Sequence, residues 1–167
     1  QFQATGHPRV GGCFHAPAFQ FLYQAFRVGF QGVDLELTGA GDLTTLAPFR
    51  EGKLLVQDPA ARLVSLIAGV QPGQKVLDLC AAPGGKSFSA AFAMEDKGEI
   101  VSCDLHKNKL KRIQEGAARL DLTSITTSAG DGRVFRPEWA ERFDTVLVDA
   151  PCSGLGIIRK KPDVRYK

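Results

Sequence analysis

The sequence contains no apolar run long enough to cross a bilayer and no basic start followed by an apolar segment. Without these features, neither a membrane span nor a secretion signal is expected. Internal repeats and low-complexity stretches are also absent. The 167 residues, 44% of them hydrophobic and 23% charged, are enough for one globular domain, or for a domain and a piece of another.

The four cysteines are widely spaced, and no two of them form a C-x-x-C pair. Cys103 with His106, and Cys13 with His15, offer two metal ligands each, whereas a structural zinc site needs four. We therefore expect no bound metal. Cys80 and Cys103 end apolar strand patterns, which predicts small buried side chains in a reducing compartment and hence a cytoplasmic protein.

A strong positive charge is missing as well, because the net charge is only +3. Five cations nevertheless crowd the last nine residues: Arg159, Lys160, Lys161, Arg165 and Lys167. Five aromatic residues gather near the other end: Phe14, Phe19, Phe21, Tyr23 and Phe26. The cations could bind phosphates and the rings could stack on bases. A solvated surface and a small core are the alternative interpretations of these two features.

The second half of the chain alternates strand and helix patterns at the spacing of βαβ units. Strands are predicted at 75–80, 99–104, 124–129 and 143–149, with helices at 86–94 and 106–120. The longer helix places four apolar residues at helical spacing: Leu110, Ile113, Ala117 and Leu120. This order predicts an α/β domain with a parallel, helix-covered sheet.

A helix is also predicted upstream, where Asp58 caps a start with Pro59 at the first helical position. Its apolar residues are expected to face the sheet: Leu63, Leu66, Ile67 and Val70. Before it, Val33–Leu37 alternates like a half-exposed strand and Asp42–Phe49 offers a capped helical turn. We interpret 1–55 as part of a small α+β subdomain and 56–167 as part of the α/β domain.

The turn after the first parallel strand predicts a cofactor loop. It is not a P-loop, because Cys80 stands where the first glycine of that motif belongs, and it has no G-x-G-x-x-G. Small residues at Cys80, Ala82 and Gly84 allow close backbone approach to a ligand. Asp104 ends the second strand, where it could bind ribose hydroxyls, and Asp131 after the third could meet an adenine amino group. The pattern favours a cofactor that contains a nucleoside.

The fourth strand ends in Asp149, followed by Pro151 and Cys152. Carboxyl ends of parallel strands share one edge of a sheet, so this acid and thiol are expected beside the cofactor loop. Acid, thiol and cofactor together indicate an enzyme.

The segments Asp78–Lys86 (DLCAAPGGK) and Asp149–Gly154 (DAPCSG), with Gly-Asp-Gly at 130–132 and IRKKPD at 158–163, resemble the RNA cytosine carbon-5 methyltransferases. The resemblance is closest to the Sun/Fmu type, which modifies 16S ribosomal RNA. It implies a Rossmann-like methyltransferase sheet, here truncated, that binds S-adenosylmethionine.

The resemblance also assigns roles. The loop would cradle the methionine part of the cofactor through Cys80, Ala81, Ala82, Pro83, Gly84, Gly85 and Lys86. Asp104 would hold the ribose and Asp131 would meet the adenine. Asp149 would lie between the methyl donor and the target base.

A thiol is needed because carbon 5 of cytosine becomes nucleophilic only after addition to carbon 6. Cys152 is the candidate from this chain alone, yet the resemblance gives it a role in product release and assigns the attack to a Thr-Cys pair. No Thr-Cys pair occurs in the 167 residues. We therefore expect a piece cut before a fifth strand and inactive alone. Two alternatives remain open: a DNA cytosine methyltransferase with Cys152 as nucleophile, and a non-catalytic RNA-binding module that keeps the cofactor pocket.

Overall fold

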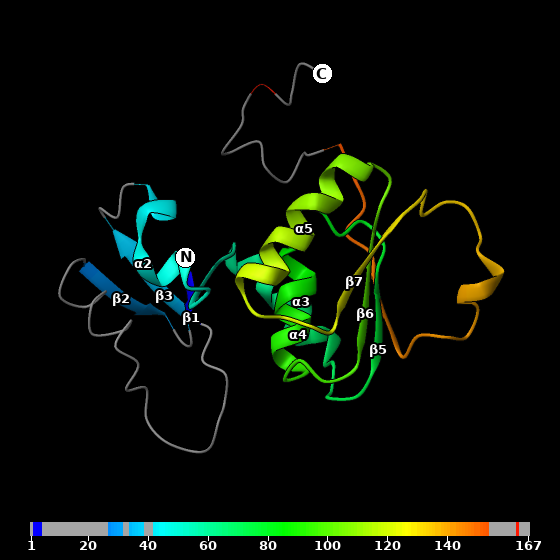
Figure 1. Cartoon of the computed structure of the whole chain (residues 1–167), viewed down its shortest axis with the longest axis horizontal. Coiled ribbons are helices and arrows are strands. Elements are labelled where there is room, and N and C mark those ends of the chain that lie inside the picture. The colour runs from blue at the N-terminus through cyan, green and yellow to red at the C-terminus, as the bar shows by residue number, and fades with distance from the viewer. Residues whose placement is uncertain (1, 5–26, 32–33, 39–41, 154–162, 164–167) are drawn as a thin grey trace.

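The computed structural model describes residues 2–4, 27–31, 34–38, 42–153 and 163, which form two sheets with their helices (Figure 1). Several sequence features lie outside the described residues, namely Cys13 and His15, the aromatic group at 14–26 and the cations at 159–161 and 165–167. Within the described part, no helix is both long and apolar enough to cross a membrane.

The first sheet is antiparallel and comes from the N-terminal third of the chain. Its strands are β1 (Phe2–Ala4), β2 (Arg27–Gln31), β3 (Asp34–Thr38) and β4 (Leu54–Val56), in the order β2-β3-β1-β4. Between β3 and β4 lie the short helices η1 (Leu43–Thr45) and α2 (Ala47–Arg50). Asp42 begins η1 by accepting a hydrogen bond from the Thr44 N–H at 2.9 Å. The predicted strand and the predicted capped turn are both confirmed.

The second sheet is parallel and confirms the predicted alternation. Its strands are β5 (Lys75–Asp78), β6 (Glu99–Asp104), β7 (Ile125–Ala129) and β8 (Thr145–Leu147), in the order β7-β6-β5-β8. The helices are α3 (Pro59–Ala68), α4 (Gly85–Ala93) and α5 (Lys107–Arg119), and a short turn η2 (Pro137–Trp139) precedes β8. The chain first builds outward from β5 to β7 and then returns to place β8 on the other side of β5. This reversal is the point at which open α/β sheets form their ligand sites.

All three helices lie on one face of the parallel sheet (Figure 1). Under them, Val76, Ile100 and Leu147 from three strands join the main core. The predicted apolar face of α5 is buried, with Ile113 fully enclosed. The periodicity of α5 therefore identified its inner face correctly.

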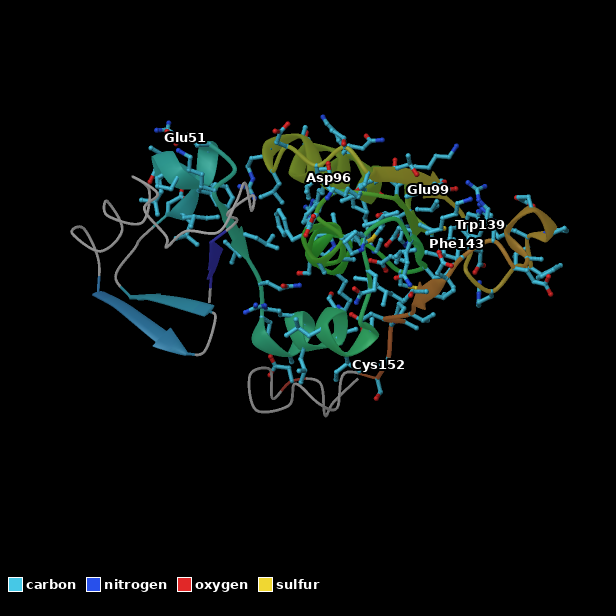
Figure 2. The ribbon with its side chains drawn as sticks, turned by 90° about the horizontal axis from the view of Figure 1, so that it is seen from below. Glu51, Asp96, Glu99, Trp139, Phe143 and Cys152 are labelled. Atoms are coloured by element: carbon cyan, nitrogen blue, oxygen red, sulfur yellow. The ribbon has the colours of Figure 1, made fainter. Side chains whose placement is uncertain are left out.

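The opposite face is covered by the connection from β7 to β8. Trp139 and Phe143 from this connection pack edge to face, 6.1 Å apart, over the side chains of Leu77 and Val101 (Figure 2). This connection reaches only part of the strand β8. Val146 in β8 and Val148 just after it are 50% and 61% exposed, so the strand predicted at 143–149 is shorter than expected and partly exposed.

The prediction that the apolar residues of α3 face the sheet is wrong for three of them. Leu63, Leu66 and Ile67 are exposed rather than turned to the sheet, although Val70 is buried as expected. The helix packs on α4 through a second stripe of small residues, represented by the buried Ser65. Small side chains let two helix backbones approach closely, and periodicity alone does not say which of two stripes faces inward.

The buried face of α5 and the exposed face of α3 predict different losses of stability when an isoleucine is replaced by alanine. Ile113→Ala empties a fully buried position and should lower the free energy of unfolding by about 2–5 kcal/mol. Ile67→Ala, at a position 76% exposed, should change it by no more than about 0.5 kcal/mol. Urea denaturation measures both, and comparable losses would show that the outer face of α3 is buried after all.

Candidate functional site

A cavity of about 520 Å³ opens at the carboxyl edge of the parallel sheet. It is lined from all four strand ends, by Leu79, Cys80, Asp104, Leu105, His106, Lys109, Asp131, Gly132, Arg133, Val148, Ala150 and Pro151. The structure thus brings together three residues predicted for the cofactor site from positions far apart in the sequence: Cys80, Asp104 and Asp131.

Asp104 ties two strand ends together. Its side chain is almost fully buried, with a residue exposure of 7%. One carboxylate oxygen accepts from the Ala82 N–H at 3.3 Å, and the other accepts from the His106 N–H at 3.0 Å. The carboxylate is therefore held in place by the backbone of the loop after β5 and of the turn into α5.

Asp131 is held by a neighbour. Arg133 donates to its carboxylate through Nη2 at 2.6 Å, through Nε and through the backbone N–H at 3.0 Å. These hydrogen bonds lower the pKa of Asp131 to about 2. The side chain is ionised throughout the physiological range and can accept a hydrogen bond from an amino group in the cavity.

Residues of the loop after β5 face different parts of the structure. Ala81 is buried, its N–H donating to the Cys103 carbonyl at 2.9 Å, whereas Pro83 and Gly85 line a different cavity, of about 500 Å³, that faces residues 42–56. Gly84 has φ of +111°, and a Cβ there would lie 2.5 Å from the ring of Phe88. The tight start of α4 therefore requires glycine at this position.

Lys86 connects this loop to the end of β8. Its ammonium group lies 2.5 Å from the carboxylate of Asp149, although the two residues are 63 positions apart. Lys86 is largely enclosed, with 18% of its side chain exposed, while 61% of the Asp149 side chain is exposed. Cys152, three residues further along, is exposed (Figure 2). It is not among the residues that line the cavity.

A buried polar chain behind the loop was not identified from the sequence. Ser102 donates to the hydroxyl of Ser87 at 2.7 Å, and Ser87 donates to the carboxylate of Asp78 at 2.8 Å. Burial raises the pKa of Asp78, while the Ser87 hydroxyl and the charge of Lys86 act in the opposite direction. The available signal was a carboxyl group at the end of a buried strand, which needs a partner inside the protein.

Gln57 is a second contact that the sequence did not reveal. Its amide donates to the Gly85 carbonyl at 3.0 Å and accepts from the Ser89 hydroxyl at 2.6 Å. A single glutamine between a strand and a helix gives no periodic or motif signal.

Of the two cysteines that were expected to be buried, only one is. Cys103 is buried as expected, but Cys80 is only half-buried because it lines the cavity. Burial raises the pKa of the Cys80 thiol, and the nearby Asp104 carboxylate adds to the effect. Burial likewise raises the pKa of Cys103, so both side chains are neutral thiols at pH 7. In the described part of the chain, no group of three or more His, Cys, Asp or Glu residues could hold a metal ion.

The polar chain predicts a stability loss that depends on pH. Above the raised pKa of Asp78 the carboxylate is ionised, and Ser87→Ala should cost about 1.5–3 kcal/mol, as expected for a hydrogen bond to a charged group. As the pH falls through that pKa the carboxyl becomes neutral in the folded state, so the cost should shrink. Urea denaturation at pH 7 and pH 4 compares the two. Ser65→Ala, which removes a bond to the Lys86 carbonyl, is the control whose cost should not change with pH. A Ser87→Ala cost that is equal at both pH values would contradict the account.

Comparison with known proteins gives consistent matches. Residues 65–167 match the family model described as 16S rRNA methyltransferase RsmB/F. A probable ribosomal RNA small subunit methyltransferase B from Bacillus subtilis is 47% identical over 119 residues, covering 71% of this chain and 27% of the relative. The ribosomal RNA small subunit methyltransferase B of Vibrio cholerae is 40% identical over 126 residues, covering 75% and 29%.

Two solved structures are also similar to this chain. The crystal structure of PH0851 superposes with a TM-score of 0.84 at 30% identity, covering 99% of this chain and 38% of that one. NSun6 from Pyrococcus horikoshii, solved with SFG, gives a TM-score of 0.64 at 30% identity, covering 74% and 33%. The family model covers well over half of the 167 residues, including all four parallel strands and the cavity between their ends. The chain therefore belongs to the 16S rRNA methyltransferase RsmB/F family.

Proposed function

We propose that this chain supplies the cofactor-binding part of an enzyme that transfers a methyl group from S-adenosylmethionine to carbon 5 of a cytosine in 16S ribosomal RNA. The observation that carries the proposal is the pair of aspartates Asp104 and Asp131, which lie at or just after the ends of two neighbouring parallel strands and line one cavity. Asp149 does not line it, although its neighbours Val148 and Ala150 do. The chain spans about 27–29% of the length of the curated relatives it matches, so the activity belongs to the longer protein.

The residues around the cavity fit S-adenosylmethionine. Asp104 is fixed by two backbone N–H groups and can hold the ribose hydroxyls, while Asp131 can accept from the adenine amino group. The loop from Cys80 to Lys86 would cradle the methionine part, and its first residue, Cys80, lines the cavity. A related structure was solved with SFG, an analogue of this cofactor.

The bound cofactor would supply an electrophilic methyl group. Asp149 and Lys86 form the charged pair beside it, and we assign Asp149 the place between the methyl donor and the target base. A thiolate would add to carbon 6 of cytosine and make carbon 5 a nucleophile for that methyl group, with S-adenosylhomocysteine as the leaving group. Loss of the carbon-5 proton would then expel the thiol. Lys86 holds the Asp149 carboxylate in an ion pair.

Cys152 is assigned to product release rather than to the attack. It is exposed, three residues beyond Asp149, and does not line the cavity. The attacking thiol would come from a Thr-Cys pair outside these 167 residues. Cys80 and Cys103, whose pKa values are raised, are unsuited to act as nucleophiles.

The RNA substrate is supported by the names of the relatives, which are small-subunit ribosomal RNA methyltransferases. We also propose that residues 1–55 form a separate subdomain, because the antiparallel strands of the described part of the chain lie between Phe2 and Val56, with the last, β4, ending one residue past the boundary. We further propose a cytoplasmic location, which agrees with the reduced, neutral thiols of Cys80 and Cys103.

The proposed cofactor can be tested by calorimetric titration with S-adenosylmethionine. Asp104→Ala should weaken binding by about 1.5–3 kcal/mol, since it removes a charged hydrogen-bond acceptor. Glu115→Ala, which removes an exposed carboxylate on the same side of the sheet, is the control and should bind normally. Equal affinities of wild type and Asp104→Ala would remove Asp104 from the site.

The role of Cys152 can be tested in a chimera in which this chain replaces the matched segment of the Bacillus subtilis relative. We expect the chimera to methylate 16S ribosomal RNA. With Cys152→Ala, methyl transfer should remain possible while a covalent RNA–protein adduct accumulates, because release is impaired.

Denaturing gel electrophoresis with labelled RNA detects the adduct. Absence of an adduct together with abolished methylation would make Cys152 the nucleophile, as in the DNA-type alternative. Cys13→Ala in the same chimera is the matched cysteine control and should behave as the parent.

A further inference from the structure

Gln57 links the antiparallel sheet to the start of α4. It follows β4 directly and precedes Asp58, which begins α3 by accepting from the Ala60 N–H. Its side-chain amide reaches a segment 28 residues further along the chain, where the Gly85 carbonyl accepts from Nε2 at 3.0 Å. Oε1 accepts from the nearly buried hydroxyl of Ser89 at 2.6 Å.

The orientation of this amide is determined by its partners. The Gly85 carbonyl can only accept, so the NH₂ end of Gln57 must face it. The carbonyl end of the amide then faces Ser89, whose hydroxyl donates. A residue that lacks either end of the amide cannot replace both hydrogen bonds.

Helix α4 begins at Gly85, and its N-cap residue Gly84 has no side chain that could bond to the N–H groups of the first turn. The contacts from other elements go instead to the carbonyl oxygens of this turn. Gln57 contacts the carbonyl of Gly85, and Ser65 from α3 donates to the carbonyl of Lys86 at 3.4 Å. The first turn of α4 is thereby held from two neighbouring elements. This turn carries Lys86, the partner of Asp149.

We propose that Gln57 is a positioning residue for the methionine end of the cofactor site, an inference that rests on the proposed function above. Gln57 does not line the cavity that contains Asp104 and Asp131, so it acts through the backbone of α4 rather than by touching the ligand. Its effect should therefore be confined to the part of the ligand that meets the loop from Cys80 to Lys86. The nucleoside part, at Asp104 and Asp131, should be unaffected.

The test compares two ligands by calorimetric titration of the 167-residue chain. S-adenosylmethionine has an amino-acid part, and 5′-methylthioadenosine has the same nucleoside without it. Gln57→Met keeps the length of the side chain but removes both hydrogen bonds, and should weaken S-adenosylmethionine about three- to tenfold. Binding of 5′-methylthioadenosine should stay within about twofold of wild type.

Two further variants separate the two hydrogen bonds. Gln57→Glu keeps an acceptor for Ser89 but loses the donor to the Gly85 carbonyl, and should weaken S-adenosylmethionine at least as much as Gln57→Met. Ser89→Ala keeps the donor to Gly85 and should have the smaller effect. Ligand-free thermal unfolding verifies that each variant is folded before its affinity is compared.

Equal weakening of both ligands would show a general loss of structure and overturn the positioning role, and so would unchanged affinity for S-adenosylmethionine. If the unsubstituted chain, shown to be folded by the same thermal unfolding measurement, binds neither ligand, the proposed cofactor is wrong and the role of Gln57 falls with it. Binding of 5′-methylthioadenosine alone by wild type would overturn the methionine end of the site while leaving the nucleoside end in place.

Discussion

The hydrogen-bonded chain from Ser102 through Ser87 to Asp78 is the contact on which the site depends. It joins β6, α4 and β5 inside the protein, where water cannot replace a lost partner. Burial raises the pKa of Asp78, and the Ser87 hydroxyl opposes that rise. A buried acid with a specific partner orients its elements more narrowly than apolar contact does, because a hydrogen bond has a direction. The start of α4, and the loop before it, are fixed relative to two strands by this chain.

Asp104, Asp131 and Asp149 lie at or just after the ends of three of the parallel strands, and each has a different partner that determines what it can do. Asp104 is held by backbone N–H groups, Asp131 by the guanidinium group of Arg133, and Asp149 by the ammonium group of Lys86. None of the three is an uncompensated charge. Carboxylates already oriented by such partners need little rearrangement when they accept hydrogen bonds from a ligand.

The antiparallel sheet is attached to the parallel one at two helix ends. Gln57 contacts the start of α4, and Arg119 at the end of α5 donates to the carbonyls of Phe49 and Leu54 at 2.7 and 3.0 Å. The Arg119 guanidinium also lies 4.0 Å from the centre of the Phe49 ring. Side chains that bond to backbone carbonyls hold a junction in one geometry, so the segment 49–57 is fixed against the start of α4 and the end of α5.

The sequence by itself determined the order of strands and helices, the parallel sheet, and the placement of Asp104, Asp131 and Asp149 at strand ends. These follow from local patterns of apolar and turn residues, and from the rule that carboxyl ends of parallel strands share one edge. The sequence also determined the inner face of α5, because this helix has only one stripe of apolar residues that could face the sheet.

Only the tertiary structure decided which side of α3 is buried, because small and large residues form two stripes at the same spacing. It also decided the partners of the charged groups: Arg133 for Asp131, Lys86 for Asp149 and Ser87 for Asp78. The contact from Gln57 to Gly85 was equally invisible in the sequence. The last three contacts join residues nine to 63 positions apart through side-chain directions, and those directions are set by packing rather than by any local pattern.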